Sequence, residues 1–121
     1  MTLTLTHIAN KTLQNELNTL IDKAIAKDRL AQGELYRTFH SKFMSVCLRY
    51  FENRDDALEA LNHGFLKIFT SLKKYDKQYS FEGWAYRIIQ NTAIDYARKK
   101  LKKGDFIPID EQEIEVSVNT D

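Results

Sequence analysis

The chain has 121 residues, a net charge of only +1, and just one cysteine, one proline and four glycines. This length fits a single domain, and so few prolines and glycines favour long helices over many short strands. Its one cysteine, Cys47, excludes an intramolecular disulfide and a cysteine-rich metal site, and we interpret it as a small buried hydrophobic residue. No apolar run reaches the roughly 18 residues of a membrane span and no signal peptide is visible, so we expect a soluble, cytoplasmic protein.

The small net charge hides an uneven distribution. Residues 1–65 carry eight basic and eight acidic side chains, residues 66–103 carry ten basic and three acidic, and residues 104–121 carry six acidic and no basic one. The basic block indicates a polyanion-binding site. The acidic segment either masks that site, occupies another basic surface, or is a linker whose charge is coincidental, and the sequence leaves these readings open.

The predicted elements are four helices, which together predict an all-α fold. Residues 1–12 have no period and are expected to be flexible, whereas apolar periodicity predicts helices over 13–26, 30–51, 54–74 and 80–103. Asn53 and Ser80 are the expected N-caps of the last two helices. The domain is therefore a compact bundle of about four helices over 13–104. The acidic segment 105–121 contains Pro108 and is predicted to be a linker or flexible tail.

The predicted third helix has two different faces. Its core stripe is expected to comprise Leu58, Leu61, Phe65, Ile68, Phe69 and Leu72. The opposite face carries Asp55, Glu59, Asn62, His63 and Leu66. A leucine among polar neighbours indicates a surface for a partner. His63 has no second histidine or cysteine at ligand spacing, so neither a metal site nor a cofactor is predicted.

The predicted last helix combines a core face with a polar stripe and a basic end. The core face comprises Phe81, Trp84, Ala85, Ile88, Ile89, Thr92 and Tyr96, and the stripe opposite to it comprises Arg87, Asn91, Ile94 and Arg98. The preceding loop and the helix end add Lys73, Lys74, Tyr75, Lys77, Tyr79, Lys99, Lys100, Lys102 and Lys103. Cations beside aromatic rings suit a nucleic-acid surface. A solvated helix whose terminal lysines complement its dipole would explain the same charges.

Three stretches of the chain carry a resemblance to a known family. They read LYRTFHSKFMSVCLRYFENRDDA from residue 35, DDALEALNHGFLKIFTSLKKYD from residue 55, and SFEGWAYRIIQNTAIDYARKK from residue 80. These stretches resemble region 2 of bacterial sigma factors of the extracytoplasmic-function (ECF) group, over about residues 19–103. The resemblance supports the all-α bundle that the periodicity predicts.

The resemblance implies two partners, core RNA polymerase and promoter DNA. In the family, the third helix docks on the β′ coiled coil, which implies polymerase-binding roles for Asp55, Asp56, Glu59, Asn62, His63 and Leu66. The loop and last helix bind the non-template strand of the promoter −10 element and capture a flipped base in a loop pocket. This implies DNA-binding roles for Lys73, Lys74, Tyr75, Lys77, Tyr79, Arg87, Asn91, Arg98, Lys99, Lys100 and Lys102.

Some features depart from the family pattern. The family usually has glutamine where Asn62 stands and acidic residues where Leu58 and His63 stand, and the loss of these charges would weaken steering onto a basic partner. Nothing after Gly104 resembles the family's region 4, the helix-turn-helix domain that reads the −35 element. The chain is therefore expected to be a fragment or a single-domain relative. An anti-sigma factor is a further partner that the resemblance leaves open.

Two hypotheses for function follow. The first is a transcription initiation module that docks on core RNA polymerase and recognises and opens the −10 element. The second is a sigma-like interaction domain that binds polymerase or a regulator without reading DNA. An enzyme is not supported, because the sequence has no nucleophile–base motif, no paired catalytic carboxylates and no phosphate-binding loop.

Overall fold

The structure, a computed structural model, describes residues 2–102, with the side chains of residues 8–101. Its elements are α1 (Thr2–Ile25), α2 (Arg29–Leu48), α3 (Arg54–Ser71), the 3₁₀ turn η1 (Leu72–Lys74) and α4 (Phe81–Lys102). No strand occurs within residues 2–102, and the predicted all-α fold is confirmed. The predicted tail at 105–121 lies outside the described residues.

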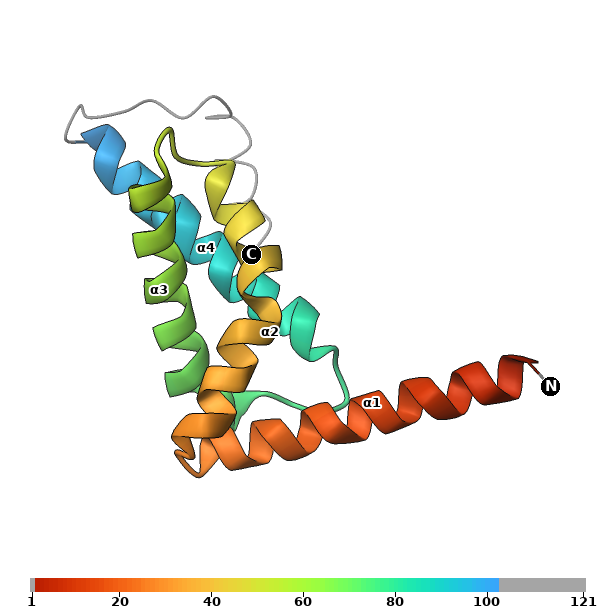
Figure 1. The fold of residues 1–121 in the computed structure, drawn as a ribbon. Helices are drawn as coiled ribbons and strands as arrows, with labels where there is room; N and C mark the ends of the chain where they lie inside the picture. Colours follow the sequence, from red (N-terminus) through yellow and green to blue (C-terminus); the bar gives the residue numbers. More distant parts are fainter. Residues whose placement is uncertain (1, 103–121) are drawn as a thin grey trace.

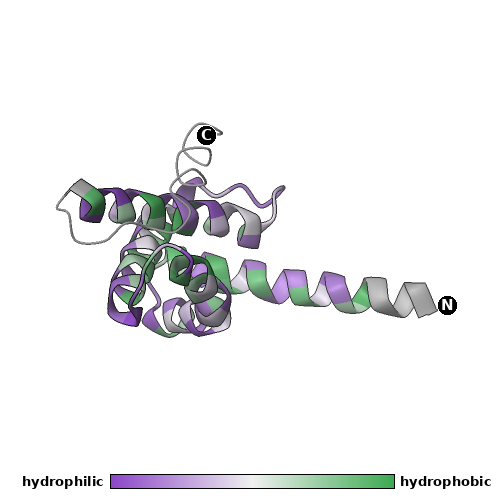
Figure 2. Cartoon of the chain, turned by 90° about the horizontal axis from the view of Figure 1, so that it is seen from above, coloured by the Kyte–Doolittle hydropathy of each residue, from purple (hydrophilic) through white to green (hydrophobic). Residues whose placement is uncertain are grey.

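Helices α2, α3 and α4 pack against one another, and α1 packs on α2 at one end and extends away from the bundle (Figure 1). Ile21 and Ala24 are buried in the core, whereas Ile8 and Leu13 are exposed. In Figure 2 the extended part of α1 carries both hydrophobic and hydrophilic stretches. Residues 8–16 of α1 are all exposed, so they bury no apolar face against the bundle, which agrees with the missing period there.

The first helix starts earlier than the predicted range of 13–26. Instead of a helix from residue 13 onward, the helix already begins at Thr2. Once the packed end of a helix has formed, each further residue adds one hydrogen bond without a new nucleation cost. A helix can thus extend beyond the residues whose apolar periodicity predicts it.

Side-chain caps fix the starts of the three bundle helices. The Asp28 carboxylate accepts from the backbone N–H groups of Leu30 and Ala31 at the start of α2. The Asn53 side chain accepts from the Asp56 N–H at 2.8 Å. The Ser80 hydroxyl accepts from the Gly83 N–H at 3.1 Å. Each bond satisfies a backbone donor that the first turn leaves free, and the caps predicted at Asn53 and Ser80 are confirmed.

The core draws buried side chains from all four α-helices, and within it α3 and α4 approach each other closely. A Cβ added at Gly64 would stand 2.6 Å from Cδ1 of Ile89, so glycine permits this approach. Along α3, Leu61, Phe65 and Ile68 are buried as the periodicity predicts. Of the other residues predicted for this core stripe, Leu72 is buried, and Leu58 and Phe69 are half-buried.

One predicted member of the polar stripe on α4 is wrong. Ile94, which the sequence pattern places on the polar stripe, is only 1% exposed. Helix α4 packs against both α2 and α3, so it buries a wider arc than one apolar face. Ala93 and Ala97 are buried beside Ile94 for the same reason. The polar stripe of α4 therefore comprises Arg87, Asn91 and Arg98 without Ile94.

Cys47 is buried as predicted. Burial raises the pKa of its thiol to about 12, because the apolar surroundings disfavour the thiolate. The thiol is therefore protonated and unreactive at neutral pH. None of the helices within residues 2–102 has the length and apolar character that a membrane span requires.

Candidate nucleic-acid pocket and partner face

An open pocket of about 530 Å³ lies where the loop after η1 meets the start of α4. It is lined by Lys74, Tyr75, Asp76, Tyr79, Ser80, Gly83, Trp84 and Arg87, and we call it the α4 pocket. The Ser80 cap fixes the first turn of α4, and the Asp76 carboxylate accepts from the Gln78 N–H and shapes the loop. The sequence therefore folds the loop back over the helix start, which brings cations and aromatic rings together.

The inner wall of the α4 pocket is made of core aromatic rings. The Tyr75 ring packs against Phe81 and Trp84, with ring centroids 5.4 Å and 5.2 Å away. Its hydroxyl donates to the Tyr79 carbonyl oxygen. Burial, with the nearby Asp76 charge, raises the pKa of Tyr75. Since Tyr75 is only 8% exposed, it supports the wall, and its DNA-binding role stays a prediction.

Trp84 contacts both the core and the α4 pocket. It is half-buried and packs against the core, as the sequence pattern predicts. It also lines the α4 pocket, which that pattern did not predict. A ring held rigidly on one face and open on the other suits stacking by a planar group.

The open groups of the pocket are one aromatic ring and two cations. Tyr79 is 68% exposed, and Lys74 and Arg87 are exposed on either side of it in the chain. Asp76 is the acidic side chain among the lining residues. This arrangement can stack one unpaired base and hold the neighbouring phosphates.

The other predicted DNA-binding residues are distributed more widely. Asn91 and Arg98 are half-buried along α4, and Lys99 is exposed. Lys77 pairs with Asp22 of α1, which ties the loop to the first helix. Lys73 is exposed but lines a different groove, between α1, α2 and α3. The side chain of Lys102 lies outside the described residues. The structure thus gathers Lys74, Tyr75, Tyr79 and Arg87 into one pocket.

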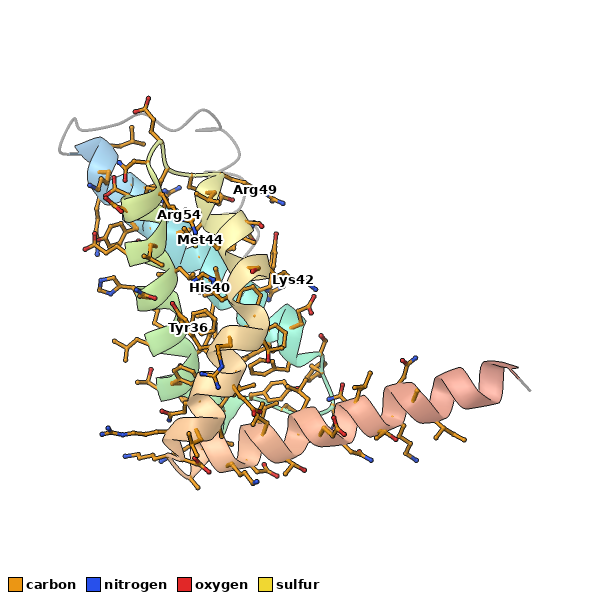
Figure 3. The ribbon with its side chains drawn as sticks, in the orientation of Figure 1. Tyr36, His40, Lys42, Met44, Arg49 and Arg54 are labelled. Atoms are coloured by element: carbon orange, nitrogen blue, oxygen red, sulfur yellow. The ribbon has the colours of Figure 1, made fainter. Side chains whose placement is uncertain are left out.

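The second site is a shallow pocket of about 250 Å³ on the outer side of α3. It is lined by Glu59, Asn62, His63 and Leu66, and we call it the partner face. Leu66 is 60% exposed, so the helix phase predicted from the sequence is confirmed. Tyr36 of α2, labelled in Figure 3, donates from its hydroxyl to the Asn62 side-chain oxygen at 3.0 Å. This bond orients the amide at the edge of the face.

Tyr96 supports the partner face from α4, a role that sequence reasoning missed. Its ring centroid lies 5.5 Å from that of His63. A hydrogen bond with the Glu59 carboxylate, helped by desolvation, raises the pKa of Tyr96 to about 12, because the neutral hydroxyl is the donor. No spacing in the sequence reveals this contact, since it joins two helices.

Asp56 and Lys100 hold each other instead of facing outward. Their charged atoms are 3.0 Å apart, and the Asn53 amide also donates to the Asp56 carboxylate. The hydrogen bond from Lys100 is the main cause that holds the pKa of Asp56 below its ordinary value. The predicted polymerase contact Asp56 and the predicted DNA contact Lys100 therefore connect the start of α3 with the end of α4. Asp55 is exposed beside them.

The structure is a helical module with an open pocket lined by aromatic rings and cations and a separate exposed face on α3. The model of the Sigma-70 region 2 family matches residues 35–103, which is more than half of the chain. The chain therefore belongs to the sigma-70 region 2 family.

Three relatives come from Bacillus subtilis (strain 168). RNA polymerase sigma factor SigV is 32% identical over 60 residues, covering 50% of this chain and 36% of SigV. The ECF RNA polymerase sigma factor SigW is 27% identical over 73 residues, covering 60% of this chain and 39% of SigW. RNA polymerase sigma factor SigI is 33% identical over 107 residues, covering 86% of this chain and 36% of SigI. The chain thus spans well under half the length of these relatives.

A solved structure supports the fold. The NMR structure of an engineered region 2 of sigmaE in complex with GTAAAA matches with a TM-score of 0.67 and 24% identity, over 74% of this chain and 94% of that one. At this identity the match shows a shared fold, which is the all-α bundle described above.

Proposed function

We propose that this chain is a transcription initiation module that docks on core RNA polymerase through the partner face and binds the promoter −10 element at the α4 pocket. The observation that carries the proposal is the α4 pocket itself, whose lining includes the exposed Tyr79, Lys74 and Arg87. It lies in the part of the chain that the family model covers. In this proposal the chain acts in the cytoplasm and carries out no catalytic step.

The shape of the α4 pocket favours an unpaired strand over a duplex. A base can enter a pocket and stack on an aromatic ring only when it has left its own stack. The sigmaE region 2 of similar fold was solved with the short sequence GTAAAA, which supplies a probe. Asn91, one turn of α4 beyond Arg87, is an amide that can read a base edge.

The partner face favours a protein. It combines one exposed leucine with polar groups at its edge, Glu59, Asn62 and His63, which is the arrangement of an apolar anchor inside a polar rim. Because Leu66 has no core to pack into, its exposure is explained when a partner covers it. The family resemblance implies that this partner is the β′ coiled coil.

The DNA half of the proposal is tested by fluorescence anisotropy with a labelled single-stranded oligonucleotide that contains GTAAAA, a scrambled strand and the matching duplex, with the chain alone and bound to core polymerase. We expect the GTAAAA strand to bind best. Arg87→Ala should weaken binding, and Arg37→Ala, an exposed arginine of α2, should not. Equal affinity for all three probes would contradict the proposal.

A second comparison separates base reading from phosphate contacts. Asn91→Ala should change the preference between the GTAAAA and scrambled strands. Lys99→Ala should weaken both alike and lower the salt dependence by about one unit of the log–log slope. If both variants lose the same affinity on every strand, Asn91 reads no base.

The second candidate function is an interaction domain that binds polymerase or a regulator, such as an anti-sigma factor, without reading DNA. The observation that favours it is that Lys77 and Lys100 are held in ion pairs within the domain, which leaves fewer cations for DNA. A polymerase pull-down with and without promoter DNA separates the two functions. Retention on polymerase together with no binding to any strand would favour the interaction domain.

A further inference from the structure

A groove of about 650 Å³ lies at the corner formed by α1, α2 and α3. It is lined by Ala24, Ile25, Lys27, Arg29, Gln32, Leu66, Phe69, Thr70 and Lys73, and we call it the basic groove. The Gln32 amide donates to the Ala24 carbonyl oxygen at 3.2 Å, which holds the ends of α1 and α2 together there. Leu66 lines both this groove and the partner face, so the two surfaces are continuous.

The chemistry of the basic groove selects its ligand. Lys27, Arg29 and Lys73 are exposed around it, and no acidic residue is among the lining residues. The ion pairs recorded within residues 8–101 involve other lysines, and the nearby Asp28 carboxylate is occupied by the start of α2. The remaining lining includes the apolar side chains of Ile25, Leu66 and Phe69. A segment with carboxylates on one side and aliphatic side chains on the other would fit.

The chain contains such a segment. Residues 111–118 have the sequence EQEIEVSV, within a stretch that carries six acidic side chains and no basic one. In an extended strand successive side chains point to opposite sides. Glu111, Glu113 and Glu115 would then share one side, and Ile114, Val116 and Val118 the other. The carboxylates match the three cations, and the aliphatic side chains match the apolar floor.

The chain length between α4 and this segment also fits. The Lys100–Asp56 ion pair places the end of α4 beside the start of α3, whereas the groove is at the other end of α3, at Phe69 and Lys73. With 18 residues, α3 is about 27 Å long at 1.5 Å per residue. Residues 103–110, extended at about 3.3–3.6 Å each, span roughly 26–29 Å. They would bring residue 111 to the groove.

We propose that the basic groove binds the chain's own residues 111–118, and that this contact covers Leu66 and competes with the partner of the partner face. The groove contact is independent of the proposed function. Only its consequence for polymerase docking rests on that function. The contact is electrostatic at its rim, so it weakens as salt rises.

The first test neutralises the segment in the full chain, with Glu111→Gln, Glu113→Gln and Glu115→Gln. Amide NMR spectra of the two proteins are compared at low salt and at 0.5 M salt. We expect shift differences for residues 25–29 and 66–73 at low salt, which vanish at high salt and do not depend on protein concentration. Differences confined to the α4 pocket, or none, would overturn the proposal. Concentration dependence would assign the groove to a second copy and overturn the intramolecular contact.

The second test measures proximity directly. A nitroxide spin label at Ser117→Cys should broaden the amide signals of residues 66–73, and the buried Cys47 thiol does not compete for the label. Arg29→Glu with Lys73→Glu should abolish the broadening. The matched control, Lys11→Glu with Arg49→Glu, makes the same charge change at exposed residues outside the groove and should preserve it. Broadening that survives reversal of the groove charges would overturn the contact.

The consequence for docking is measured by binding to core RNA polymerase. The glutamine variant should bind about fivefold more tightly than the unmodified chain, an effect of the size expected when weak surface ion pairs compete. Unchanged affinity together with positive NMR results would overturn the competition but not the contact. If neither protein binds polymerase, the proposed function fails while the NMR results on the groove are unaffected.

Discussion

The α4 pocket and the partner face are built in opposite ways. The wall of the pocket consists of core rings, because Tyr75 and Phe81 are buried and also position Trp84. The partner face lies outside the core: Leu66 is exposed, and the other residues that line this face, Glu59, Asn62 and His63, are polar. One surface therefore shares its residues with the folding core, and the other does not.

This difference predicts how the two surfaces respond to mutation. Substitutions in the pocket wall should change stability and ligand binding together. Substitutions at the pocket opening or on the partner face should change binding alone. Three variants test that separation and a fourth tests the ion pair between α3 and α4; they follow from the largest expected effect to the smallest.

Tyr75→Ala should destabilise the domain most. Removing a buried aromatic ring leaves a cavity and typically costs about 3–5 kcal/mol, and here it also removes the hydroxyl bond to the Tyr79 carbonyl. Urea denaturation followed by circular dichroism measures the free energy of unfolding. Tyr75→Phe, which keeps the ring and loses only that bond, is the matched control and should cost about 1 kcal/mol. A stable Tyr75→Ala protein would show that the ring is not part of the core.

Tyr79→Ala should change binding but not folding. Its exposed ring can contribute about 1–3 kcal/mol per stacked base to binding of single-stranded DNA, while an exposed substitution changes stability by no more than about 0.5 kcal/mol. Anisotropy with the GTAAAA strand and urea denaturation measure the two quantities. Tyr79→Phe should retain most of the affinity. If Tyr79→Ala bound the GTAAAA strand with wild-type affinity, Tyr79 would not stack on a base.

On the partner face, Leu66→Ala should likewise change binding but not folding. We expect polymerase binding to weaken by more than about 1 kcal/mol, as for an apolar anchor, with stability unchanged within about 0.5 kcal/mol. Leu30→Ala, at an exposed leucine near the start of α2, is the control and should leave binding intact. A marked loss of stability together with normal polymerase binding would assign Leu66 to the core.

Asp56→Asn should have the smallest effect, below about 1 kcal/mol for a partly exposed ion pair. The pKa of Asp56 is lowered in the folded state, mainly by Lys100, so its contribution is present above the unfolded-state pKa of about 4. It is lost as pH falls through the lower folded-state value. The stability difference between Asp56→Asn and wild type should therefore be larger at pH 7 than at pH 2. An equal stability difference at the two pH values would argue against the Lys100 pair.

The sequence determined the helical class, the caps at Asn53 and Ser80, and the phase of α3. These features depend on contacts within one helix turn or on a repeat of 3.6 residues, so they are readable locally. Leu66 illustrates this, because its outward position follows directly from the core stripe on the same helix. The family resemblance extended this to the assignment of two surfaces.

Only the tertiary structure decided how exposed each surface residue is and what it contacts. Whether Tyr75 is open or buried depends on Phe81 and Trp84, and whether Lys100 faces DNA or pairs with Asp56 depends on how α3 crosses α4. Ile94 is buried because α4 has two neighbouring helices rather than one. Periodicity describes one helix against one apolar environment, and it contains no information on how many neighbours surround that helix or which side chains they contribute.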